Sequence, residues 1–348
     1  MTPAEKLAGL SLDGEWSVAE RLDHADTTGG FFSVPYLVHD RSGKPHFLKA
    51  FDFSSAFEPR KDVIKTLQAM TAWYEHERDI LEHCKSRRLS GVVIAITHGY
   101  VLVPGLSAQE GTVYYLIFEL AEGDIRRQVD LQKRMDCVWS LKVLDDITLG
   151  LWQVHRESIA HQDLKPSNVL HYREGNSRIA DFGRASRKGR PIWTDELTVA
   201  GDQTYAPPEL LYSYTHPDFV PRRIGCDLYL LGNIASFMFS GINVTAAIFS
   251  RLDPQFHPDR WGGKYDQVLP HIQCAFEDII IDLAQQIDPI VRDDLVQIIR
   301  ELCAPDISRR GHPKGIGRHD QYSLERYKSR FDLLLKRAAI KARLRKSA

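Results

Sequence analysis

The first 120 residues alternate short apolar runs with turn-forming residues, which is the pattern of β-strands joined by tight turns. Five runs are predicted strands, at residues 15–21, 31–40, 46–53, 91–103 and 113–121. The letters DRSGK at residues 40–44 are typical of a hairpin turn between the second and third of these strands. Residues 59–88 instead repeat apolar side chains at helical spacing. We therefore expect a hairpin-connected, five-stranded sheet with one long helix.

Beyond residue 122 the apolar spacing becomes helical, and it is strongest over residues 136–156. Residues 158–208 are rich in loop-forming residues, and further helices are expected from there onward. The stretch from Lys328 to Ala348 is helix-like and holds eight Lys and Arg residues against one acid, Asp332. This stretch predicts either a solvated basic helix or a docking site for an acidic partner, a nucleic acid or a membrane surface.

Composition narrows the class of protein. The chain has 348 residues, 43% hydrophobic and 26% charged, as in ordinary soluble proteins of two domains or one large two-lobed domain. Lys and Arg number 45 against 46 Asp and Glu, which argues against a dedicated nucleic-acid binder. Five widely spaced cysteines without a CxxC pair argue against a disulfide framework and favour a reducing compartment. With no leader-like or membrane-spanning apolar run, we expect a cytoplasmic protein without a transmembrane segment.

The candidate chemistry lies in two short motifs, HQDLKPSNVL at residues 161–170 and ADFG at residues 180–183. Phosphoryl transfer needs an acceptor for the nucleophile's proton, ligands for a divalent cation and positive charge on the transferred phosphate. Asp163 can accept the proton, and Lys165, two residues later, can reach the phosphate. Asn168 and Asp181 offer the oxygen ligands that a hard cation prefers.

These motifs resemble the eukaryotic-type (Hanks-type) Ser/Thr protein kinase family, whose catalytic loop reads H-R-D-L-x-x-x-N and whose metal loop reads D-F-G. Three further segments fall in the family's order: YAPPELL at 205–211, DLYLLG at 227–232 and DISRR at 306–310. In the family, the residues matching Arg310 and Glu209 form an ion pair. The compact layout is most similar to stand-alone bacterial members.

The resemblance implies an α+β, two-lobed protein-kinase-like fold, with a small antiparallel β-sheet lobe that carries one long helix and a large, mainly helical lobe. The implied boundaries are 16–121 for the small lobe, 122–320 for the large lobe and 321–348 for the basic C-terminal helix. The implied activity is transfer of the γ-phosphate of ATP, with Mg²⁺ or Mn²⁺, to Ser or Thr hydroxyls of a protein substrate, including autophosphorylation.

The nucleotide-binding residues are also implied by the resemblance. Lys49 takes the place of the family lysine that holds the α- and β-phosphates, and Glu77 takes that of its helix partner. Backbone groups of Glu119 and Ala121 are expected to meet the adenine edge. Leu170 and Val34 are expected to pack on the two ring faces, as listed for the family positions they occupy.

The sequence departs from the family at several positions. The phosphate-covering loop keeps only its middle glycine, at Gly29, with an extra Gly30 and a bulky Phe32. Phe47 replaces a small residue that packs on adenine, and its ring either crowds the pocket or turns into the core. Gln162 replaces an Arg that pairs with a phosphorylated residue in many members, so we expect activity to need no such latch.

One more departure, Asp202 in place of Thr, puts a carboxylate within reach of Lys165, which it either pre-organises or occupies. Two other functions stay open from the sequence. The first is a pseudokinase that serves as a scaffold or binding module, favoured by Phe32, Phe47 and Asp202. The second is a small-molecule kinase of the aminoglycoside or choline type, although such enzymes typically lack both Lys165 and the Pro-Glu motif.

Overall fold

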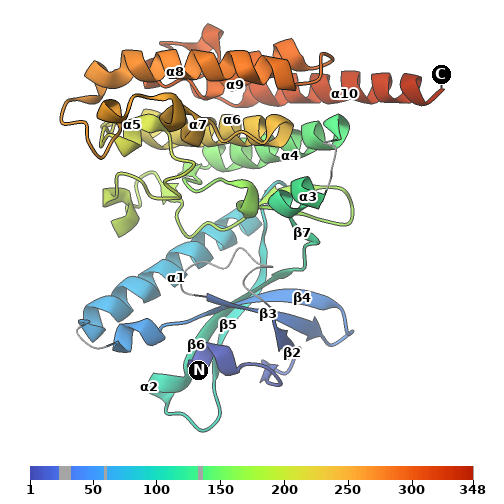
Figure 1. Cartoon of the computed structure of the whole chain (residues 1–348). Coiled ribbons are helices and arrows are strands. Elements are labelled where there is room, and N and C mark those ends of the chain that lie inside the picture. The colour runs from blue at the N-terminus through green and yellow to red at the C-terminus, as the bar shows by residue number, and fades with distance from the viewer. Residues whose placement is uncertain (23–32, 59–60, 132–135, 348) are drawn as a thin grey trace. The chain divides into compact units, whose positions relative to one another are not determined.

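The chain folds as two compact units, which are described separately. The computed structural model describes residues 1–22, 33–58, 61–131 and 136–347. The N-terminal unit consists of residues 1–125 and 170–183, and the C-terminal unit of residues 126–169 and 184–348 (Figure 1). The α+β class predicted from the sequence is confirmed, because one unit is built on an antiparallel sheet and the other is mainly helical.

The N-terminal unit is built on a six-stranded antiparallel sheet in the order β1-β2-β3-β4-β6-β5. The strands are β1 (Ser11–Leu12), β2 (Trp16–Arg21), β3 (Ser33–Asp40), β4 (Pro45–Phe51), β5 (Ala95–Leu102) and β6 (Thr112–Glu119). The expected five-stranded, purely hairpin-ordered sheet is wrong in two respects. The two-residue strand β1 is too short to leave a sequence pattern, and β6 inserts between β4 and β5. The fourth predicted strand also begins later, at Ala95, because Val92 pairs instead with Ile179.

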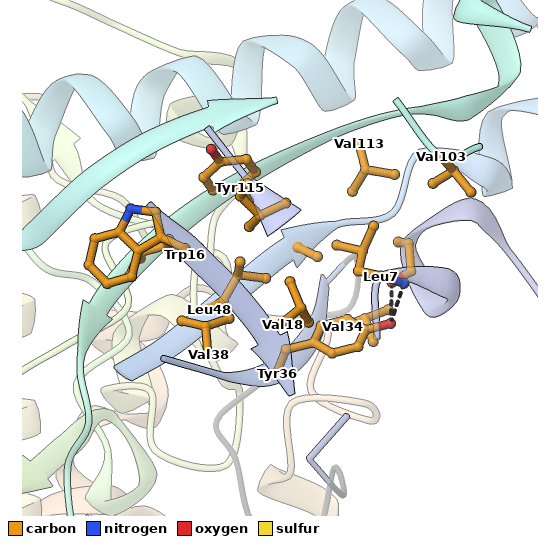
Figure 2. Close-up of a cluster of buried hydrophobic side chains, with 14 residues drawn as sticks. Leu7, Trp16, Val18, Val34, Tyr36, Val38, Leu48, Val103, Val113 and Tyr115 are labelled. Carbon is orange, nitrogen blue, oxygen red and sulfur yellow. Dashed lines mark hydrogen bonds between the residues drawn. The ribbon is translucent and has the colours of Figure 1, made fainter. Parts of the chain in front are cut away.

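One face of this sheet carries a hydrophobic cluster (Figure 2). Successive side chains of a strand point to opposite faces, so Val34, Tyr36 and Val38 share the buried face of β3. The phenol of Tyr36 donates a 2.7 Å hydrogen bond to the Ala4 carbonyl. That bond ties the short helix η1 (Pro3–Lys6) to the cluster.

The long helix α1 (Val63–Ser86) begins at Asp62, whose side chain accepts a hydrogen bond from the Lys65 amide. This N-cap satisfies one of the amides that a helix start leaves unpaired. The buried residues of α1 recur at helical spacing and are Met70, Tyr74, Glu77, Ile80, Leu81 and Cys84. An acid, Glu77, thus lies on an otherwise apolar face, where it requires a partner.

A second, three-stranded sheet completes the N-terminal unit, in the order β10-β9-β7. Its strands are β7 (Gly123–Asp124), β9 (Val169–His171) and β10 (Ser177–Ile179). In β9, Leu170 pairs with Asp124 of β7. This sheet holds the ADFG segment that follows β10.

The C-terminal unit is a set of helices around α6, which is buried along most of its length (Figure 1). The α-helices are α3 (Ile125–Leu131), α4 (Cys137–Arg156), α5 (Pro208–Leu211), α6 (Gly225–Ser240), α7 (Val244–Arg251), α8 (Tyr265–Gln286), α9 (Arg292–Leu302) and α10 (Glu325–Ser347). A π-helical turn, η6 (Val220–Ile224), leads into α6, and a short ladder joins β8 (Ile159–Ala160) to β11 (Ser186–Arg187). Within the described ranges no single helix has the length and hydropathy for a membrane span, whereas one pair bent by 85°, Val220–Ser240 with Val244–Arg251, passes by length and composition alone.

A buried ion pair links two distant segments of the C-terminal unit. Both guanidinium Nη atoms of Arg310 donate to the carboxylate of Glu209, at 2.7 and 2.8 Å. Arg310 is fully buried and Glu209 is 2% exposed. The planar fork of an arginine matches a carboxylate in this bidentate geometry. The pair therefore fixes the start of α5 to the chain after α9.

Candidate active site

In the N-terminal unit, three charged side chains meet. The ammonium of Lys49 on β4 donates to both carboxylate oxygens of Glu77, at 2.7 and 2.9 Å. It also lies 3.4 Å from Oδ1 of Asp181. The side chains are 12%, 5% and 21% exposed, respectively. A lysine head that is nearly enclosed by two carboxylates is held in one place, which suits a group that must receive a phosphate.

Local structure explains why these three side chains converge. In β4, Leu48 and Ala50 point into the hydrophobic cluster, so Lys49 must point to the opposite face. Glu77 comes from the buried face of α1. Asp181 has a positive φ of 64°, a conformation that non-glycine residues adopt in few places. Such strained backbone is concentrated at functional sites.

The charges in this cluster shift each other's ionisation. Burial alone would lower the pKa of Lys49, but the negative charges of Asp181 and Glu77 outweigh it and raise that pKa. Lys49 therefore remains a cation throughout the physiological pH range. Burial raises the pKa of the Glu77 carboxyl, and the charge of Lys49 opposes that rise.

A pocket of the N-terminal unit lies over this cluster. Its lining includes Lys49, Glu77 and Asp181, together with apolar residues from several elements. The expected adenine-edge residues Glu119 and Ala121 and the expected ring-face residue Leu170 all line it. The Glu119 carboxylate is itself held by Arg178, at 2.8 Å. Asp124, which is 3% exposed, also lines the pocket.

Two expectations for this pocket need correction. Val34 does not reach it: the side chain is 4% exposed and lies in the hydrophobic cluster with Tyr36 and Val38 (Figure 2). The reason is strand parity, since Val34 pairs with Ala50, a core residue, whereas Lys49 pairs with Pro35. The alternative in which the Phe47 ring turns into the core is also wrong. Phe47 shares the face of Lys49, lines the pocket and lies 6.2 Å from the Phe118 ring, centroid to centroid.

In the C-terminal unit, a second group of side chains surrounds Asp163. The Asn168 amide donates to the Asp163 carbonyl at 2.7 Å and to its Oδ2 at 3.1 Å. The ammonium of Lys165 lies 3.5 Å from the same Oδ2 and 3.2 Å from Oδ2 of Asp202. The backbone amide of Asp202 donates to Asp163 Oδ1 at 2.7 Å. The structure thus brings Asp163, Lys165 and Asn168 together, with Asp202 beside them.

The loop that carries these residues is anchored from below by Asp227, at the start of α6. The fully buried carboxylate of Asp227 accepts the backbone amides of His161 and Gln162, at 2.7 and 2.8 Å. It also contacts Nε2 of His155 at 2.9 Å. Gln162 itself has a φ of 68°. A Cβ on Gly201 would fall 2.4 Å from the Gln162 carbonyl oxygen, so only glycine fits there.

Sequence reasoning singled out most of this constellation but missed the anchors. Asp227 was noted only within a motif, and its role follows from a separation of 65 and 66 residues along the chain. Arg223, which contacts Gln162, carried no signal beyond its position before that motif. The expected glycine-loop residues Gly29 and Gly30, together with Phe32, lie outside the residues that the structure describes.

A family model for the protein kinase domain matches residues 53–320, which is more than half of the chain. The chain belongs to the protein kinase family. The resemblance to eukaryotic-type Ser/Thr kinases, and with it the two-lobed fold class, is thereby confirmed. The matched region of the kinase begins after Lys49 and the altered glycine loop, where the sequence departs from the family pattern.

Curated relatives of this kinase carry Ser/Thr kinase names or belong to that group. It is 26% identical over 220 residues to the cAMP-dependent protein kinase catalytic subunit PRKX of Mus musculus, which is 63% of this chain and 53% of the relative. It is 36% identical over 139 residues to MAP kinase-interacting serine/threonine-protein kinase 1 of Xenopus tropicalis, covering 37% and 33%. It is 32% identical over 144 residues to serine/threonine-protein kinase PLK4 of Drosophila grimshawi, covering 39% and 18%. The kinase thus spans about half or less of the length of these relatives.

Proposed function

We propose that this kinase transfers the γ-phosphate of ATP to serine and threonine hydroxyls of a protein substrate and of its own chain. The observation that carries the proposal is that the retained residues form working contacts within each unit. Lys49 is paired with Glu77 in one unit, and Asp163 is oriented by Asn168 and flanked by Lys165 in the other. A chain that no longer catalysed phosphoryl transfer would have no chemical reason to keep both sets.

Asp163 is the proposed acceptor of the hydroxyl proton. Its two carboxylate oxygens each accept one hydrogen bond, from the Asp202 amide and the Asn168 amide, which fixes the plane of the group. Each oxygen retains a further lone pair for the substrate hydroxyl. The ammonium of Lys165, 3.5 Å from Oδ2, stabilises negative charge that develops on the transferred phosphate.

The residues present also fit the ATP and divalent metal that the family uses. The lining of the pocket includes Leu81, Val93 and Ala180, which suits the apolar faces of a base, and Lys49 supplies a fixed cation for phosphate oxygens. Asp181 and Asn168 would hold the metal, since a carboxylate and an amide oxygen are ligands for a hard cation. When bound, Mg²⁺ or Mn²⁺ neutralises the charge of the phosphate oxygens.

The test is transfer of label from [γ-³²P]ATP with Mg²⁺ to the protein and to generic acceptors. The wild type is compared with Asp163→Asn and Asp181→Asn, and with Asp79→Asn as a matched control. Asp79 is an exposed acid that pairs only with its neighbour Arg78 among the printed ion pairs of the described chain. We expect label on Ser or Thr in the wild type and the control, and none in the other two variants. Equal label in all four proteins would refute the assignment of Asp163 and Asp181.

A pseudokinase is the second candidate, and the position of Phe47 favours it. An aromatic ring that lines the nucleotide pocket and approaches Phe118 reduces the space for a base. Thermal stability measured with and without Mg·ATP separates the two functions. A protein that is neither stabilised by ATP nor labelled is a binding module. Aminoglycosides and choline, added as acceptors in the same assay, test the small-molecule alternative.

We also infer a cytoplasmic setting and leave α10 outside the catalytic proposal. All five cysteines are free, and three of them are buried, which suits a reducing compartment. The proposed acidic or nucleic-acid partner of the basic C-terminal helix would compete with the chain's own acids. Lys328, Arg330 and Arg337 are paired with Asp145, Glu301 and Asp294, respectively.

A further inference from the structure

The segment from Ser186 to Asp202 lies in the C-terminal unit and contains the 3₁₀ turn η5 (Trp193–Glu196). In many kinases the residue at the position of Gln162 is an arginine that binds a phosphorylated side chain in this segment. Gln162 has no charge to offer a phosphate. The segment is nevertheless tied to the catalytic loop by a different set of contacts.

Those contacts run through Arg223, which belongs to the π-helical turn η6 and is 3% exposed. Its Nη1 donates to Oε1 of Gln162 at 3.1 Å. The amide of Gln162 in turn donates to the Arg223 carbonyl at 2.8 Å. The two side chains therefore bind each other reciprocally, and the guanidinium stands directly behind the catalytic loop.

The other end of the Arg223 guanidinium holds Asp195. Its Nη2 donates to the Asp195 carbonyl at 2.7 Å and lies 3.4 Å from the Asp195 carboxylate. That carboxylate also accepts the Ser186 hydroxyl and the Ile192 amide. Asp195 thus fastens both the start of the segment and its own turn to one buried cation.

The neighbouring threonine does not offer a competing phosphorylation site in this conformation. Thr194 is fully buried, and its hydroxyl has no hydrogen-bond partner among the described residues. A phosphate there would add up to two negative charges in an enclosed position. Two carbonyls of the turn, at Asp195 and Leu197, are instead bound by Nη2 of Arg222.

We propose that Arg223 and Asp195 are positioning residues that replace the arginine–phosphate latch, so that the segment is ordered without phosphorylation. A carboxylate built into the chain takes the place of the phosphate, and a buried arginine reached through Gln162 takes the place of the catalytic-loop arginine. The inference rests on the proposed kinase activity, because what the ordered segment positions is the protein acceptor. Neither residue touches the reacting atoms.

The experiment combines hydrogen exchange with kinetics. Wild type, phosphatase-treated wild type, Asp195→Asn and Arg223→Lys are compared, with Glu196→Gln as the matched control. Glu196 is an exposed acid in the same turn. Amide exchange in peptides covering residues 186–204 is measured by mass spectrometry, and peptides of α9 report whether the unit is folded.

We expect phosphatase treatment and Glu196→Gln to leave exchange and transfer unchanged. Asp195→Asn and Arg223→Lys should accelerate exchange in the segment, but not in α9, and should lower kcat/KM for a protein acceptor roughly tenfold, as for the loss of one charge-assisted hydrogen bond. The KM for ATP should stay constant, which a general loss of folding would not allow. Loss of protection or activity on dephosphorylation, or wild-type exchange in both variants, would overturn the inference. If the wild type transfers no phosphate, the proposed function fails, while the exchange data still decide the latch.

Discussion

At the scale of single residues, the Lys49–Glu77 contact carries the most exact geometry of the N-terminal unit. Both carboxylate oxygens of Glu77 lie within 2.9 Å of the Lys49 ammonium. Asp181 is more distant, at 3.4 Å, so it cannot hold the ammonium alone in the same place. Positioning by Glu77 should therefore be visible in catalysis more than in folding.

Replacement Glu77→Gln should lower kcat/KM for ATP by about 10², because small displacements of a phosphate-binding group are costly in catalysis. Glu75→Gln is the control, since Glu75 is exposed on the same helix. Steady-state kinetics with varied ATP measures the effect. Equal kinetics in the two variants would mean that Lys49 needs no partner.

Phe47 gives a prediction with the opposite sign. Phe47→Ala removes a ring that lines the pocket, so ATP should bind severalfold more tightly, as measured by titration calorimetry or by KM. The stability cost should be below that of a core Phe→Ala change, because the side chain is only half-buried. Weaker binding of ATP by the variant would show instead that the ring stacks on the base.

Asp202 determines how Lys165 responds to pH. Burial alone would raise the pKa of Asp202, but hydrogen bonds from Thr204 and the charge of Lys165 lower it below the usual 3.8. A carboxyl whose pKa is lowered on folding stabilises the protein above the unfolded value and loses that effect only as the pH falls through the folded value. The Asp202–Lys165 pair is thus intact throughout neutral pH.

We therefore expect Asp202→Asn to lower kcat severalfold by the same factor at every pH between about 5 and 9. The expected fall reflects a Lys165 that is less firmly held beside Asp163. A pH–rate profile of both proteins is the measurement. A higher kcat in the variant would mean that Asp202 keeps Lys165 away from phosphate, and a factor that changes with pH would assign the titration to Asp202.

At the scale of elements, α10 is a structural part of its unit. Tyr327, Phe331 and Leu334 are buried to 2% exposure or less, and the helix packs along α4 (Figure 1). Its cations near the start of the helix pair with acids of α4 and α9. Burial ends at Ala338, and the side chains described beyond it are half-buried or exposed.

Phe331→Ala should consequently lower the free energy of unfolding by about 3 kcal/mol, as for other fully buried Phe residues. Removal of residues 339–348 should leave that free energy unchanged within error. Urea denaturation of the two variants beside the wild type measures both. A large loss on truncation would show that the last turns are also part of the core.

The elements differ in how well the pattern of the sequence predicts them. The strands β2, β3 and β4 and the helix α1 lie close to their expected positions, because alternation and helical spacing are local properties. The insertion of β6 beside β4 depends on contacts between residues about 70 apart in sequence and leaves no local trace. Val34 illustrates the same limit, since counting from Lys49 does not reveal which face of β3 points to the pocket.

At the scale of the whole molecule, the candidate catalytic residues are divided between two units. Letters alone pointed to Lys49, Glu77, Asp163 and Asp181, because the chemistry demands those residue types in that order. The supports did not follow from letters. Asp227 and Arg223 act on the catalytic loop from more than 60 residues away, and only the folded chain shows what they contact.

The Glu209–Arg310 ion pair has a consequence for the timing of synthesis. Its partners are 101 residues apart, and every motif proposed for catalysis precedes Arg310 in the chain. At about 5–20 residues per second, Glu209 leaves the ribosome roughly 5–20 s before its partner. During that interval the carboxylate has no guanidinium to be buried against, so α5 cannot settle in its final place. A nascent chain that already holds Asp163 and Asp181 is thereby kept from acting on its neighbours until its large unit is nearly complete.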